Sequence, residues 1–148
     1  MKHLFACWGI FFALCILNPA SADEPIIGYI KTISDQTTID ERDGPVKASL
    51  GSPIQVGNVI KTDQNGSAGI TLKDNTILSI GPNTEFKIEA YQFEPQQDKL
   101  QLNASLLKGT LHYISGVIAK LKPEAVTVKT PTGVIAVRGT RFLVKIEE

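Results

Sequence analysis

Hydrophobic and polar residues alternate along most of the chain, in short runs separated by turn residues. Within residues 67–72, Ala68, Ile70 and Leu72 would share one face, and residues 84–91 repeat the same spacing. Side chains two positions apart lie on the same side of a β-strand, so this pattern predicts strands with one buried face. No window of about 11 residues keeps the 3.6-residue period of a helix. The pattern therefore favours an all-β protein.

Turn residues separate the predicted strands at short intervals. Asn65-Gly66 is the strongest hairpin signal, because both residues tolerate a positive φ. A short helical turn competes with strand only in residues 117–125. We expect strands at 26–33, 51–62, 67–72, 76–80, 84–91, 99–106, 109–116 and 126–130, followed by a final apolar segment at 130–146. The predicted fold is a compact two-sheet sandwich or roll, or a short β-solenoid, of short antiparallel strands.

The final segment contains two alternating apolar sets that are out of phase with each other. The sets are Ile135 with Val137, and Phe142 with Val144. A β-bulge with a positive φ at Gly139 would turn both sets toward the core and place Arg138 at a sheet rim. Without the bulge Arg138 would be buried, and a buried charge needs a partner. In either case we expect its guanidinium to brace a neighbouring turn through Asp63, Asp74 or Glu85, with ligand binding as the alternative.

The N-terminus has the features of a secretion signal. After a short polar start, residues 4–17 are uncharged and mostly apolar, and Ala20-Ser21-Ala22 gives the small-residue pattern that signal peptidase accepts. An uncleaved anchor is the alternative, but the apolar run is shorter than the roughly 20 residues that a membrane-spanning helix needs. We therefore expect residues 1–22 to be a cleaved signal peptide and residues 23–148 to form a single β domain.

Cysteine usage and charge narrow the class of function. Cys7 and Cys15 both lie in the expected signal peptide, so the exported domain would have no disulfide, thiol nucleophile or cysteine metal site. The chain has 15 basic and 15 acidic residues, interspersed without a basic block. The sequence therefore lacks the clustered positive charge that binds nucleic acid, and we do not expect nucleic acid as a partner.

Three stretches of the sequence are distinctive when taken together. They are "LGSPIQVGNVIKTDQNGSAGITLKDNTILSIGPNTEFKI", "LLKGTLHYISG" and "VTVKTPTGVIAVRGTRFLV". In combination they resemble the FecR-type domain of bacterial envelope proteins over residues 26–146. The most specific element is Thr130-Pro131 with Arg138-Gly139-Thr140, which we expect to act as a structural motif.

The resemblance implies an all-β module in the periplasm of a Gram-negative-type envelope, serving contact rather than catalysis. The name-giving members of the family are inner-membrane regulators that also carry a sigma-factor-binding segment and a transmembrane helix. This sequence resembles only their periplasmic domain. We therefore do not carry sigma-factor regulation over to it.

Candidate catalytic and metal-binding residues are few. His112 is the one histidine downstream of the expected signal peptide, and a lone histidine in a strand is more often packed or solvated than a general base. The "DQNG" turn at 63–66 lacks the ligand spacing of an EF-hand. We expect no catalytic residue, no cofactor site and no metal site, and hence not an enzyme.

Two functions remain after these exclusions. The first is a protein-interaction or signalling module that binds another envelope protein, for example by adding a strand to an open sheet edge. The second is a module for cell-wall or surface glycan, which would stack sugar rings on exposed aromatic side chains. Tyr91 and Phe93 share one face beside the polar residues 92–98 and are the expected partner contact in either case, unless both simply cap the core.

Overall fold

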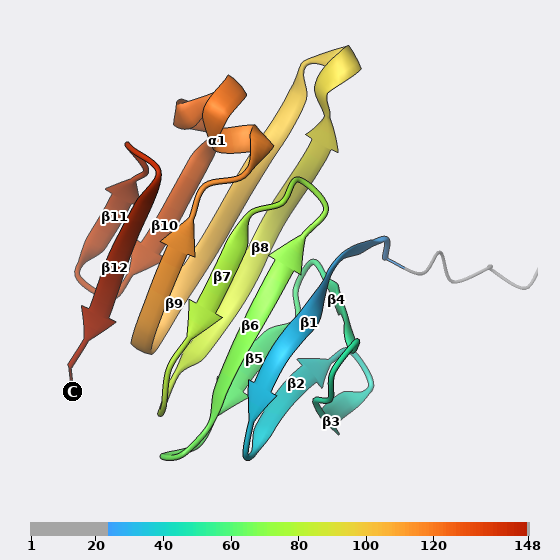
Figure 1. The fold of residues 1–148 in the computed structure, drawn as a ribbon, viewed down its shortest axis with the longest axis vertical. Helices are drawn as coiled ribbons and strands as arrows, with labels where there is room; N and C mark the ends of the chain where they lie inside the picture. The colour runs from blue at the N-terminus through green and yellow to red at the C-terminus, as the bar shows by residue number, and fades with distance from the viewer. Residues whose placement is uncertain (1–23, 148) are drawn as a thin grey trace, which may run out of the picture.

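The computed structural model describes residues 24–147, which form a curled β-sheet with little helix (Figure 1). A five-residue helix, α1 (Val117–Leu121), and two single-turn 3-10 helices interrupt the strands. The strands are β1 (Ile26–Ser34), β2 (Thr37–Glu41), β3 (Gly44–Lys47), β4 (Pro53–Gln55), β5 (Val59–Thr62), β6 (Ser67–Leu72), β7 (Ile77–Ile80), β8 (Glu85–Glu94), β9 (Lys99–Ile114), β10 (Val126–Thr130), β11 (Gly133–Ala136) and β12 (Arg141–Ile146).

The long strand β9 holds the two halves of the sheet together. Its first part pairs with β8 and β10, and its last part pairs with β7 and β12. We call β3-β2-β5-β8-β9-β10-β11 the back half and β4-β1-β6-β7-β9-β12 the front half. Figure 1 shows the front half lying over the back half. Among the described strands, β9 and β10 form the one parallel pair, and the remaining pairs are antiparallel.

Gly109 lies at the point where β9 passes from the back half to the front half. Its φ of 91° is one that residues with a side chain rarely adopt. A Cβ at this position would also overlap the backbone of Thr84. Two hydrogen bonds fix that approach, because the Thr84 hydroxyl accepts the amide of Thr110 at 3.0 Å and the Thr84 amide donates to the Thr62 hydroxyl at 2.9 Å. The change of direction in β9 therefore depends on glycine.

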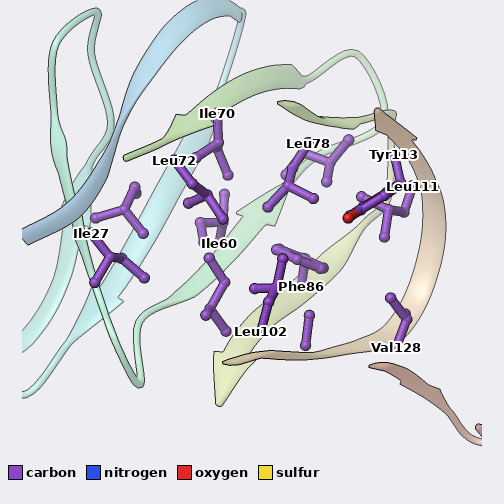
Figure 2. Close-up of a cluster of buried hydrophobic side chains, with 14 of the residues drawn as sticks. Ile27, Ile60, Ile70, Leu72, Leu78, Phe86, Leu102, Leu111, Tyr113 and Val128 are labelled. Atoms are coloured by element: carbon purple, nitrogen blue, oxygen red, sulfur yellow. The ribbon is translucent and has the colours of Figure 1, made fainter. Parts of the chain in front are cut away.

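The core fills the space between the two halves (Figure 2). Alternate residues of most strands point into it, which is the pattern that the period of two predicts. Tyr113 of β9 stacks on Phe142 of β12, with ring centroids 4.8 Å apart. The largest fully buried side chains are Tyr113, Phe86, Ile30, Ile39, Ile54, Ile60, Ile70, Leu72, Leu78, Ile88, Leu102 and Leu106.

The all-β prediction is confirmed. The strands at 67–72 and 126–130 have the predicted bounds. A short helix does form within 117–125, where the sequence left helix and strand open. The two strands expected at 99–106 and 109–116 are instead one strand, because Gly109 bends the chain without ending its pairing. The described strands form one continuous sheet in place of two separate ones. Neighbours in this sheet are out of chain order, which the successive coils of a β-solenoid would not give.

The prediction of a single final strand with a bulge is wrong. Residues 133–136 turn back on β10 as β11, whereas residues 141–146 cross to the front half and pair with β9 as β12. Gly139 has the expected positive φ, 97°, but it lies in the connection between the two strands. The predicted inward set is correct, because Val137 is buried and Ile135, Phe142 and Val144 pack against the core.

The expected signal peptide, residues 1–22, lies outside the described residues. Within the described part of the chain, no helix has the length and apolar character needed to cross a membrane.

Candidate interaction surface

Tyr91 and Phe93, the expected partner contacts, are half-buried and pack against the core. The Tyr91 hydroxyl donates to Oδ1 of Asp74 at 3.0 Å and accepts the Asp74 amide at the same distance. Burial raises the pKa of Tyr91, and the neighbouring Asp74 carboxylate raises it further. Both side chains therefore contact the core, and their role as a partner contact stays a prediction.

Asp74 is a fully buried carboxylate in the turn between β6 and β7. It accepts hydrogen bonds from the Thr76 hydroxyl at 2.7 Å and from the amide of Ile118, at the start of α1, at 3.1 Å. With Tyr91, these bonds join β8 and α1 to the turn that carries Asp74. Several hydrogen bonds to one carboxylate offset the cost of burying it. From the sequence, Asp74 was a turn aspartate beside apolar strands and a possible partner of Arg138, and this buried role was not predicted.

Arg138 does not make the expected brace. Its side chain is exposed, and no hydrogen bond or ion pair joins it to Asp63, Asp74 or Glu85. The donors to Asp74 come instead from the groups around its own turn. Exposure removes the need for a partner, because water solvates the guanidinium at little cost.

The other residues of the predicted motif shape the end of the chain. Thr130 and Pro131 begin the turn between β10 and β11, where the Thr130 hydroxyl donates to the Gly133 carbonyl at 3.0 Å. Ser115 fixes the start of β12, because its hydroxyl donates to the Gly139 carbonyl at 2.9 Å and its amide to the Thr140 carbonyl at 2.8 Å. Thr130, Gly139 and Thr140 therefore take part in hydrogen bonds within the fold.

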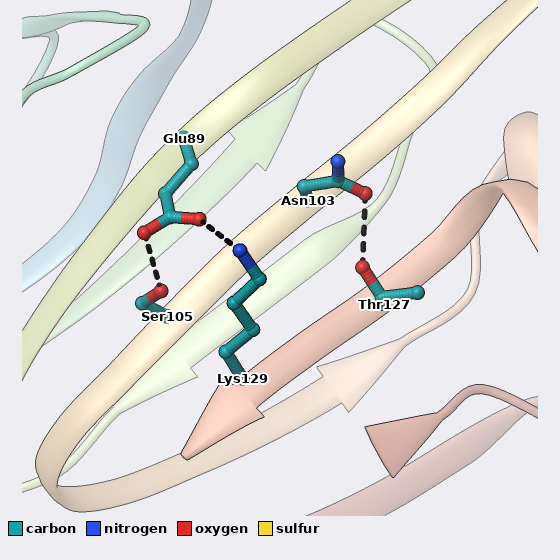
Figure 3. A network of polar contacts seen from close by, with 5 residues as sticks. All are labelled: Glu89, Asn103, Ser105, Thr127 and Lys129. Atoms are coloured by element: carbon teal, nitrogen blue, oxygen red, sulfur yellow. Dashed lines mark hydrogen bonds and ion pairs between the residues drawn. The ribbon is translucent and has the colours of Figure 1, made fainter. Parts of the chain in front are cut away.

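The outer face of the back half carries many charged residues, and several of them pair with each other. Nζ of Lys61 lies 2.6 Å from Oδ2 of Asp40. The Glu89 carboxylate accepts hydrogen bonds from Nζ of Lys129 at 3.2 Å and from the Ser105 hydroxyl at 2.8 Å (Figure 3). The hydrogen bonds from Ser105 and Lys129 lower the pKa of Glu89. We call this surface the charged face, and its charged members include Asp40, Lys61, Glu85, Lys87, Glu89 and Lys129. It has the character of a solvated sheet surface.

The outer face of the front half carries very little charge. Two rows of cross-strand neighbours run from β1 to β12 across this surface, which we call the charge-poor face. The rows are Tyr29, Thr71, Ile77, Ile114 and Arg141, and Thr32, Gly69, Ser79, His112 and Leu143. Leu143 is 68% exposed, Tyr29 39% and Ile77 37%. Neither row contains a carboxylate, so the two rows have apolar and hydroxyl groups, a histidine and one cation at the rim. Lys31, Lys145 and Glu147 lie beside the rows on the same side of the sheet.

His112 lies on the charge-poor face, opposite Ser79 and Leu143. Among the residues that the structure describes, no cluster of histidine, cysteine or carboxylate side chains has the arrangement of a metal site. In these surroundings His112 contributes a partly exposed polar group to the charge-poor face.

The sheet edges differ from one another. Strands β3 and β4 are four and three residues long and contain Pro45 and Pro53, and short edge strands with proline resist the addition of a further strand. The edge strand β11 has four residues and no charged residue. By contrast, β12 has six residues and no proline, and among the described strands it pairs with β9 alone. The edge of β12 is therefore the one best suited to accept a further strand.

The backbone groups on the free edge of β12 can be assigned from two hydrogen bonds. The Ser115 amide donates to the Thr140 carbonyl, and the Gly81 amide donates to the Thr110 carbonyl on the other side of β9. Because backbone groups alternate in direction along an antiparallel strand, the even-numbered residues of β12 bond to β9. The amides and carbonyls of Arg141, Leu143 and Lys145 then point away from the sheet.

The comparisons with known proteins place the chain in a family. No curated protein matches it. A solved structure described as a cell surface anchoring domain is 28% identical over 43% of this chain and 84% of its own, with a TM-score of 0.41. The sequence pattern of the FecR protein family matches residues 58–148, a shorter range than the 26–146 of the expected resemblance. The chain belongs to the FecR protein family.

Proposed function

We propose that this chain is an exported, non-catalytic interaction module of the bacterial envelope, located in the periplasm. It binds a protein partner by adding the partner's strand to the free edge of β12, beside the charge-poor face. The open edge of β12 is the observation that carries the proposal. A strand with unpaired amides and carbonyls supplies affinity through the backbone, and its side chains select the partner.

Family membership and the expected signal peptide support the envelope location. The charge-poor face supports a protein partner, because exposed apolar residues that lie together on a sheet are typical of docking surfaces. Its exposed residues are also continuous with the edge, since Leu143 belongs to both.

A glycan partner has less support from the side chains. Tyr91 and Phe93 are packed against the core, which leaves Tyr29 as the aromatic side chain of the charge-poor face. One side of the Tyr29 ring already faces Lys31, whose Nζ lies 5.6 Å from the ring centroid. Sugar rings need an open aromatic surface, so this arrangement favours a protein over a glycan.

Site-specific photo-crosslinking in intact cells tests the proposal. A photoreactive residue in place of Ile77 on the charge-poor face is expected to capture a protein, whereas one in place of Lys87 on the charged face is the matched control. Leu143→Pro should abolish the capture at position 77, because it removes an amide from the free edge without breaking the pairing to β9. Equal capture from both faces, or recovery of glycan fragments alone, would overturn the proposal.

A further inference from the structure

We propose that the strand added at the edge of β12 is the β12 of a second copy of this chain, so that the module forms a symmetric antiparallel dimer. This inference rests on the proposed function, because it names a partner for the same edge. It is carried by the order of charges and apolar residues along residues 141–147.

The strand is complementary to its own reverse. In an antiparallel pair centred on Val144, Arg141 of each copy lies opposite Glu147 of the other, and Phe142 lies opposite Ile146. Opposite charges directly across a strand pair stabilise it, and like charges destabilise it. A register centred on Leu143 would instead place Arg141 opposite Lys145, which repel each other. The charges therefore select one register.

The same register satisfies the backbone. Centring on Val144 brings the outward amides and carbonyls of Arg141 and Leu143 opposite those of residues 147 and 145 in the second copy, as a hydrogen-bonded antiparallel pair requires. Glu147 is already on the outer side of the sheet, because its carboxylate lies 3.0 Å from Nζ of Lys145. It would therefore meet Arg141 without a change of face.

A second copy would also add apolar contacts on the inner side of β12. Phe142, Val144 and Ile146 pack against the core but remain half-buried, and no strand of residues 24–147 lies beside β12 on its free side. A second β12 would place three further apolar side chains beside them. A two-fold axis at Val144 makes the contact isologous and closed, so it gives a dimer and not a fibre.

Sedimentation equilibrium of the purified exported protein, over about 5 to 500 µM, measures the association expected for a small interface. Arg141→Glu and Glu147→Arg should each weaken the dimer by about tenfold, because each creates two like-charged pairs. The double variant Arg141→Glu with Glu147→Arg should restore it. Lys87→Glu, on the charged face, is the control and should leave association unchanged.

Oxidative crosslinking checks the register independently. Val144→Cys places two cysteines opposite each other across the two-fold axis, so a disulfide-linked dimer is expected, whereas a cysteine from Ile146→Cys lies opposite Phe142 and should form no disulfide. Monomers at every concentration, or a dimer that ignores the charge variants, would overturn the second copy as partner. Capture at position 77 that still depends on Leu143 would then leave the proposed function standing with a different partner, and loss of that capture would remove both.

Discussion

The two outer faces of this sheet cover the same core but differ in their charges, their exposed apolar residues and the pairing of their edges. On the charged face, Lys61 pairs with Asp40 and Lys129 with Glu89, so most charges have partners within the chain. The charge-poor face has exposed Ile77 and Leu143 and no carboxylate in its two rows, and it ends at an unpaired edge. The charged face therefore has the character of a solvated sheet surface, and the charge-poor face is the one on which the proposed partner would bind.

A single strand contributes to both faces, which shows how local the difference is. In the back half, the outward side chains of β9 include Asn103, which accepts a hydrogen bond from Thr127, and Ser105. After Gly109 the outward residues are Thr110, His112 and Ile114. The bend at Gly109 thus separates the two surfaces.

Replacing Gly109 with alanine should have the largest effect, because it removes the bend on which both faces depend. The new Cβ would overlap Thr84 and the backbone would keep a strained positive φ, so we expect a loss of roughly 2–4 kcal/mol in the free energy of unfolding. Urea denaturation measures it. Gly133→Ala is the matched control, because a Cβ there meets no atom within 4 Å. Equal stability of the two variants would contradict the role of Gly109.

Two tyrosines, Tyr91 in β8 of the back half and Tyr29 in β1 of the front half, give the next effect. Tyr91→Phe removes a donor to the buried Asp74 and the acceptor of its amide, which should lower the free energy of unfolding by about 1–3 kcal/mol. Tyr29→Phe lies on the charge-poor face and should change it by less than about 0.5 kcal/mol. Thermal unfolding of both variants compares them. Similar losses would mean that the hydroxyl of Tyr91 is as dispensable as that of Tyr29.

The same tyrosine predicts a loss of stability in alkali. Burial raises the pKa of Tyr91 above its value of about 10 in the unfolded chain. A raised pKa in the folded state means that its contribution is complete below pH 10 and is lost as the pH rises above it. Unfolding measured from pH 8 to 11 should show that decline, and Tyr91→Phe should make it shallower. Burial also raises the pKa of Tyr113, so a part of the decline should remain in the variant.

Much of the fold could be predicted because the alternation of side chains is a local signal. It gave the inward set of β12 and the strand at 67–72 correctly. The alternation could not show that residues 133–136 and 141–146 pair with different strands. The same side chains alternate in and out whichever strand each segment pairs with. Which strand each segment pairs with depends on the arrangement of the whole sheet.

The interaction surface was harder to predict than the fold. Tyr91 looked exposed because a polar stretch follows it, but its hydroxyl bonds to Asp74, 17 residues earlier in the chain. Arg138 looked structural because it interrupts an apolar run, but it lies in an exposed connection. The free edge of β12 was inferred only in general terms, since an edge is defined by the strand that is missing beside it.

The smallest effect is expected on the charged face. Lys129→Met breaks the ion pair with Glu89, but both groups are partly exposed, so the free energy of unfolding should fall by less than about 1 kcal/mol. The Ser105 hydroxyl and Lys129 lower the pKa of Glu89, so their contribution is present above the unfolded pKa of about 4.3 and is lost as the pH falls. The difference between variant and parent should therefore shrink from pH 7 to pH 3. High salt should reduce it in the same way, because it screens exposed charges. A loss at pH 7 as large as that of Tyr91→Phe would show that this face contributes to stability as much as the buried Asp74 does, and the contrast between the two faces would no longer hold.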